Sequence, residues 1–144
     1  NKNVTKQITK EKMFGLNKIN TYKKFSIRVN KSKKRLIKII DNLKNKGNKI
    51  VGYGATAKSV TIMNYCNINN DLINFFFDTT PEKINKFLPG KNIKILKYNK
   101  DQLTNFDYAF LGAWNFKKEI FNKEKSNIKK GLKFITHVPY PRII

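Results

Sequence analysis

The stretch from Ile50 to Lys58, which reads IVGYGATAK, constrains the fold of this chain more than any other part of the sequence. An apolar run leads into a turn that carries Gly52 and Gly54, and a helical pattern follows. A strand, a glycine turn and a helix in this order direct backbone N–H groups and a helix N-terminus to one point, which favours a phosphate group. The third glycine of a dinucleotide-binding fingerprint would fall on Ala57, and alanine is tolerated there.

Polar side chains follow the turn directly. Lys58 would lie in the first turn of the helix, where a cation opposes the helix dipole, so its presence indicates an anion nearby. The hydroxyl groups of Thr56 and Ser59 could donate further hydrogen bonds. A tight turn that binds no ligand is the alternative interpretation of the same pattern.

Apolar segments alternate with helical patterns over the rest of the chain. Segments typical of strands are 49–53, 72–78, 93–96, 108–114 and 134–138, and segments typical of helices are 56–66 and 116–130. This alternation predicts an α/β fold with a Rossmann-like, three-layer parallel sheet of about five strands. Ligands of such sheets bind outside the carboxyl ends of the strands, so we expect segments 52–59, 78–83, 114–115 and 139–142 to meet at the site.

A long helix is expected before the first strand. Apolar residues recur mostly at spacings of three and four between Ile19 and Leu43, which predicts one amphipathic helix or two that break near residues 30–32. Residues 1–14 are polar and rich in lysine, and we expect them to be a linker. The folded domain is expected to span residues 15–144.

The strand ends carry three further candidate ligand-binding residues. Asp78 could accept hydrogen bonds from ribose hydroxyls, or could equally cap the turn that follows it. Trp114 could stack on a base or a sugar, or belong to the core. Asn115 could bind a ligand, although capping the following helix is the favoured role.

The formal net charge of +22 is not taken as evidence for nucleic-acid binding. Of the 31 basic residues, only Arg28, Arg35 and Arg142 are arginines. Lys, Asn and Ile share A/T-rich codons, so a biased genome explains the excess of all three. Proteins that read base sequence favour arginine. We therefore expect no specific nucleic-acid partner, although the charge would help to attract a phosphorylated ligand.

Several function classes are not expected. A single cysteine, Cys66, cannot form an internal disulfide, which favours a reduced, cytoplasmic setting. One cysteine and one histidine, His137, do not suffice for a zinc site, and the histidine is expected to be structural. No run of about 18 apolar residues could span a membrane. No catalytic set of residues stands out, so a binding domain is expected.

Six motifs occur in order along the chain and resemble one family when they are taken together. They are VGYGATAK at 51–58, NYC at 64–66, FDTTPEK at 77–83, LPG at 88–90, AWNF at 113–116 and PYPRI at 139–143. Over residues 15–144 the chain resembles the C-terminal domain of the S-adenosylmethionine-dependent sugar C-methyltransferases. That family methylates carbon 3 of nucleotide-linked 4-keto-deoxysugars. The sequence departs from the family at Ser59 and Asn85, where the family usually has glycine.

The resemblance implies a division of labour within a larger enzyme. The family has a zinc-binding N-terminal domain and a central domain that holds S-adenosylmethionine and the catalytic base. The C-terminal domain binds the nucleoside-diphosphate sugar, needs no cofactor of its own and is not active alone. On this chain, the residues implied at the substrate are Tyr53, Gly54, Ala55, Thr56, Ala57 and Lys58 at the diphosphate, with Trp114, Asn115 and Arg142 in the same cleft. The alternative is a stand-alone NAD- or nucleotide-binding Rossmann module.

Overall fold

A computed structural model describes all residues, 1–144, and divides them into two compact units, residues 1–32 and 33–144. The first unit holds α1 (Lys2–Met13) and the beginning of α2 (Ile19–Asn45). The side chain of Asn1 caps α1 by accepting a hydrogen bond from the N–H of Asn3. No residue of α1 is buried. The segment expected to be a linker is therefore helical, and its role as a linker stays a prediction.

Helix α2 is a single helix without a break at residues 30–32. Its buried side chains are Leu36, Ile40 and Leu43, which recur at the predicted spacings and pack into the core of the second unit. The helix ends before Gly47, whose positive φ of 80° suits a glycine after a helix C-terminus. The N–H of Gly47 donates to the carbonyl of Lys44 at 2.8 Å.

The second unit is built on a six-stranded sheet with the order β3-β2-β1-β4-β5-β6. The strands are β1 (Ile50–Tyr53), β2 (Phe75–Asp78), β3 (Lys94–Lys97), β4 (Tyr108–Leu111), β5 (Lys133–Thr136) and β6 (Arg142–Ile143). The first five strands are parallel, which confirms the predicted α/β class. The sequence did not predict β6, a two-residue strand antiparallel to β5, because two residues show no periodicity.

The remaining elements are short, apart from α3. They are α3 (Ala57–Cys66), η1 (Pro81–Lys83), α4 (Lys100–Leu103), η2 (Trp114–Phe116), α5 (Lys117–Lys123) and α6 (Lys125–Lys129). The helix predicted over residues 116–130 is thus divided into α5 and α6 at Glu124. The expected cap from Asn115 was wrong, because α5 follows Phe116 with no side-chain cap.

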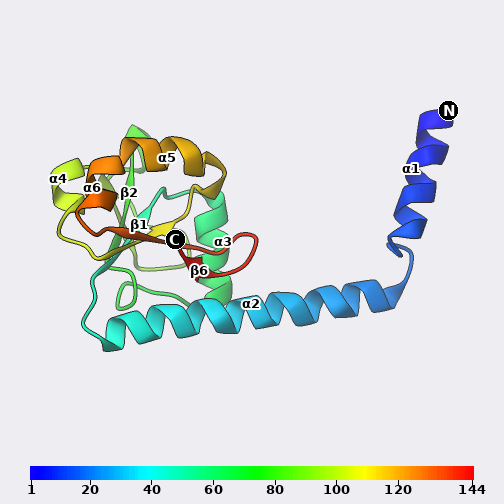
Figure 1. The fold of residues 1–144 in the computed structure, drawn as a ribbon, viewed down its shortest axis with the longest axis horizontal. Coiled ribbons are helices and arrows are strands. Elements are labelled where there is room, and N and C mark those ends of the chain that lie inside the picture. Colours follow the sequence, from blue (N-terminus) through cyan, green and yellow to red (C-terminus); the bar gives the residue numbers. More distant parts are fainter. The chain divides into compact units, whose positions relative to one another are not determined.

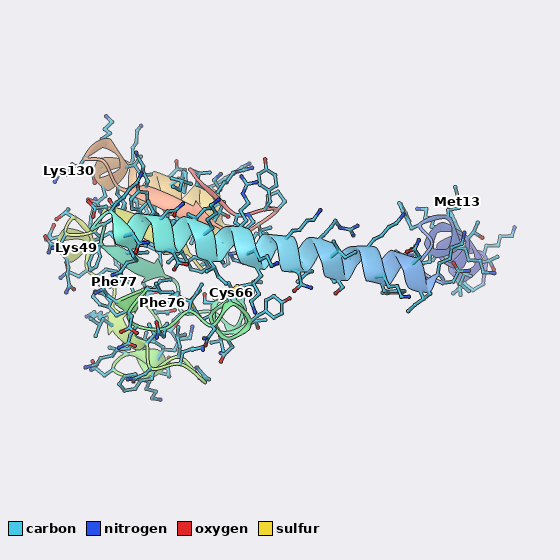
Figure 2. All side chains as sticks on the ribbon, turned by 90° about the horizontal axis from the view of Figure 1, so that it is seen from below. Met13, Lys49, Cys66, Phe76, Phe77 and Lys130 are labelled. Carbon is cyan, nitrogen blue, oxygen red and sulfur yellow. The ribbon has the colours of Figure 1, made fainter.

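Two hydrophobic cores lie on opposite faces of the sheet. Within residues 33–144, α2 and α3 cover one face, while α4, α5 and α6 cover the other (Figure 1). Phe76 and Phe77 of β2, both labelled in Figure 2, enter different cores because successive side chains of a strand point to opposite faces. Cys66 is a buried free thiol in the first of these cores.

We expect Ile40→Ala to lower the free energy of unfolding by about 2–5 kcal/mol, because it leaves a cavity in the core between α2 and the sheet. Ile27→Ala on the same helix is the matched control. Ile27 is 55% exposed, so its truncation should cost about 0.5 kcal/mol or less. Urea denaturation followed by circular dichroism measures both, and equal losses would contradict the assignment of the core.

Candidate functional site

The turn between β1 and α3 requires glycine at position 54. Gly54 has a φ of 87°, which L side chains rarely adopt, and a Cβ there would lie 2.9 Å from the Cβ of Ala113. Its N–H donates to the carbonyl of Phe77 at 2.8 Å. The turn is therefore held against the ends of both β2 and β4.

Thr56 and Ser59 form a reciprocal cap at the start of α3. The Thr56 hydroxyl oxygen accepts from the N–H of Ser59 at 3.2 Å, and the Ser59 hydroxyl oxygen accepts from the N–H of Thr56 at 3.4 Å. Ser59 also donates to the carbonyl of Gly54 at 2.8 Å and is fully buried. The Ser59 hydroxyl, predicted as a substrate contact, thus bonds within the turn.

Asp78 joins the end of β2 to the same turn. One carboxylate oxygen accepts from the N–H of Ala55 at 2.7 Å, and the other accepts from the N–H of Thr80 at 2.8 Å. Lys83 forms an ion pair with it at 3.3 Å. Burial acts to raise the pKa of Asp78, but the hydrogen bonds from Thr80 and Ala55 and the charge of Lys83 outweigh it, so the pKa is lowered.

These contacts decide which N–H groups of the turn can meet a ligand. The N–H groups of Gly54 and Ala55 already have acceptors at 2.8 and 2.7 Å. The N–H groups of Ala57 and Lys58 donate to no group outside α3, as is usual in the first turn of a helix. An anion at this end of α3 would therefore bind Ala57 and Lys58 rather than the glycine turn.

Three of the predicted residues come together beside α3. The ammonium group of Lys58 lies 3.4 Å from the side-chain oxygen of Asn115 and 5.7 Å from the ring centre of Trp114. Trp114 is half-buried, whereas Lys58 and Asn115 are exposed. Because the side-chain amide of Asn115 is neutral, it does not cancel the charge of Lys58, which stays available to an anion.

A cleft of about 340 Å³ opens at the carboxyl ends of β1, β2 and β4. Of the predicted site residues it is lined by Tyr53, Gly54, Thr56 and Asp78. The expected segment 78–83 also contributes Thr79, Thr80 and Lys83 to the lining. The lining residues that lie outside the expected segments are Phe77, Tyr98, Ala113, Phe116, Glu119, Ile120 and Lys123.

A second hollow of about 300 Å³ shares Thr56 and Lys83 with this cleft. Its walls come mostly from α3 and from the loop after β2, and they include Val60, Phe87 and Pro89. The side chain of Phe87 is 53% exposed. The start of α3 is therefore flanked by two hollows.

A buried glutamate fixes the aromatic wall of the cleft. Glu124 has no exposed surface, and one of its oxygens accepts from the hydroxyl groups of Tyr53 at 2.8 Å and Tyr98 at 2.5 Å. Burial first, and then the bond to Glu124, raise the pKa of both tyrosines. The hydroxyl of Tyr53 is thus engaged inside the protein. The sequence did not predict a buried role for Glu124, because its neighbours are lysines in a segment that has the pattern of a surface helix.

Arg142 and His137 lie outside the lining of the cleft. Arg142 is in β6, and its guanidinium is 4.8 Å from the ring centre of Tyr140. His137 stacks on Phe110 with ring centres 5.4 Å apart, and burial lowers its pKa to about 4. Its Nδ1 is buried without a hydrogen-bond partner. His137 is therefore neutral at pH 7.

No group of three or more His, Cys, Asp or Glu side chains is arranged so that it could hold a metal ion. None of the helices is both long and apolar enough to cross a membrane.

Comparisons with known proteins agree on the class of this domain. The family model described as "C-methyltransferase C-terminal domain" matches residues 1–139. The curated protein C-methyltransferase NovU of Streptomyces niveus is 31% identical to this chain over 143 residues. The match covers 98% of this chain and 34% of NovU, so the chain spans about a third of the length of that relative.

We expect Asp78→Asn to destabilise the protein at pH 7 by about 1–3 kcal/mol, because it removes the charge that accepts three hydrogen bonds. The folded pKa of Asp78 is lowered, so its stabilisation is complete above the unfolded pKa of about 3.9 and is lost as the pH falls through the folded pKa. The difference in urea midpoint between the two proteins should therefore be smaller at pH 3 than at pH 7. The exposed Asp71→Asn is the control, and an equal effect of that change would contradict the prediction.

His137 should make the free energy of unfolding depend on pH in a higher pH range than Asp78 does. Its pKa is about 4 in the folded state and about 6.5 in the unfolded state, so between these values the unfolded state binds more protons. Stability should therefore fall as the pH decreases from 6.5 to 4. In His137→Gln we expect this dependence to be weaker when urea midpoints are compared at pH 6.5 and 4.5. An unchanged slope would show that His137 is not buried in its neutral form.

Proposed function

This chain belongs to the C-methyltransferase C-terminal domain family, and on that premise we propose that it binds the nucleoside-diphosphate sugar that a larger C-methyltransferase methylates. The proposed sugar is a 4-keto-deoxysugar. The S-adenosylmethionine site, the catalytic base and a zinc site would lie in the part of the parent protein that this chain does not span. The methyltransferase domain that carries them is the proposed partner of this domain.

The beginning of α3 is the observation that carries the proposal. Two N–H groups, those of Ala57 and Lys58, point out of a helix N-terminus without an acceptor in the loop before it. The ammonium of Lys58 adds a full positive charge beside them. Helix N-termini with free N–H groups bind phosphates because hydrogen bonding and the helix dipole act together. We place the diphosphate there.

The two hollows on either side of this helix end support a ligand with bulky groups at both ends of a diphosphate. A nucleoside-diphosphate sugar has this form, with a nucleoside on one side and a sugar on the other. The two hollows share the lining residues Thr56 and Lys83, and Thr56 directly precedes Ala57 at the proposed diphosphate position. Their volumes of about 340 and 300 Å³ are each within the usual range for ligand pockets.

The chain's own residues would bind and orient the substrate, and the reacting proton would be removed elsewhere. A base must reach the proton that it abstracts. The Asp78 carboxylate is held by three donors, and Glu124 has no exposed surface, so neither is placed for that role. In line with the family resemblance, we assign the catalytic base to the remainder of the parent protein.

A stand-alone NAD-binding module is the second candidate, because Asp78 ends β2 where dinucleotide folds use an acid to bind ribose hydroxyls. Both oxygens of Asp78 accept hydrogen bonds from this chain, and Lys83 adds an ion pair. A ribose would have to compete with these partners. This observation disfavours the ribose contact at Asp78 that a dinucleotide-binding module would make.

We expect Lys58→Ala to weaken the binding of UDP-glucose or dTDP-glucose by about 1.5–3 kcal/mol, which is at least about tenfold, because a charge-assisted bond to phosphate is lost. Isothermal titration calorimetry in about 0.15 M salt measures it. The exposed Lys129→Ala, which removes the same charge on α6, is the control. A loss below about 0.5 kcal/mol would contradict the diphosphate site. NAD binding that is tighter than nucleotide-sugar binding would overturn the proposed function.

A further inference from the structure

Arginine is rare in this chain, and its positions are therefore informative. Three of the 31 basic residues are arginines: Arg28, Arg35 and Arg142. The composition favours lysine wherever a positive charge alone is sufficient. Lysine cannot replace arginine where a planar, forked donor is needed, so each remaining arginine marks a place where that shape could matter.

Two of the three arginines meet at one tyrosine. Arg35 of α2 lies 5.6 Å from the ring centre of Tyr140, and Arg142 of β6 lies 4.8 Å from it. Neither guanidinium has a carboxylate partner, because the ion pair in this structure joins Lys83 and Asp78. Neither charge is neutralised by the protein, so an anion that reached both guanidinium groups would gain two charge-assisted interactions.

Stacking on an aromatic ring does not by itself explain the arginines. Four lysines make the same kind of contact at ring-centre distances of 3.6–5.7 Å: Lys33 on Tyr65, Lys58 on Trp114, Lys117 on Phe121 and Lys123 on Tyr98. Lysine therefore serves for cation–π contacts throughout this chain. The property that remains specific to Arg35 and Arg142 is the bidentate donor geometry of the guanidinium group.

We propose that Arg35, Tyr140 and Arg142 form a binding site for a phosphoryl oxyanion. Each guanidinium would donate two parallel N–H bonds to phosphoryl oxygens, and the Tyr140 hydroxyl would donate a further one. The site is accessible, because Arg35 is exposed, Arg142 is half-buried and Tyr140 is 49% exposed. None of these three residues lines the cleft or the hollow beside α3. The family resemblance implies Arg142 at the substrate but neither Arg35 nor Tyr140, so the pair assigns a phosphoryl site that the proposed function does not include.

The test replaces arginine by lysine, which keeps the net charge and removes the forked donor geometry of the guanidinium group. Inorganic pyrophosphate and UDP-glucose are titrated into the 144-residue protein and into Arg35→Lys, Arg142→Lys and Arg28→Lys, in about 0.15 M salt to screen nonspecific attraction. Arg28 is the matched control, because it contacts Phe25 and no second guanidinium contacts that ring. We expect at least a fivefold loss of pyrophosphate affinity in the first two variants and no change in the third.

The outcomes separate this inference from the proposed function. Unchanged pyrophosphate affinity in Arg35→Lys and Arg142→Lys, an equal loss in Arg28→Lys, or no binding of pyrophosphate at all would overturn the site. A parallel loss of UDP-glucose affinity supports the site and moves the diphosphate of the nucleotide sugar from the start of α3 to the arginine pair. A loss confined to pyrophosphate supports a separate phosphate site. If UDP-glucose does not bind any of the proteins while pyrophosphate binding depends on the pair, the proposed function fails and this inference stands.

Discussion

The hydrogen bond from the Ala55 N–H to the Asp78 carboxylate is the contact on which the site depends. It ties the end of β2 to the turn after β1 at a distance of 2.7 Å, in a place where Asp78 is only 8% exposed. An unpaired carboxylate buried there would be costly, so the turn, the loop that begins at Thr80 and the side chain of Lys83 are held in register by one group. The start of α3 and both hollows take their positions from that arrangement.

The same contact explains what the sequence could predict and what it could not. The α/β class and the five parallel strands follow from apolar runs at regular positions, because buried strands leave a periodic signal. The acceptor of each N–H in the turn leaves no such signal, since it depends on residues 20 or more positions away. Gly54 and Ala55 therefore fit the phosphate motif in the sequence and yet bond to Phe77 and Asp78 in the structure.

Departures from the family pattern have local physical explanations. Ser59 stands where the family usually has glycine, and its hydroxyl closes the cap of α3 instead of facing a ligand. Asn85 also replaces a glycine. Its φ of 63° lies in the left-handed region, which asparagine tolerates better than most residues, so the backbone geometry that a glycine would supply is retained there. Long-range partners such as Glu124 and Tyr98 can be found only once the strands are placed side by side.

One outer edge of the sheet is the two-residue strand β6, and the other is covered by the loop before β3. On one side β6 pairs with β5, so Thr136 and Ile135 face Arg142 and Ile143. On the other side the loop before β3 bonds to its free edge, since the N–H of Ile95 donates to Lys86 and that of Asn85 to Ile95. No long strand edge is left to recruit a strand from another polypeptide. Assembly through side-chain surfaces is therefore favoured over extension of the sheet into a partner's sheet.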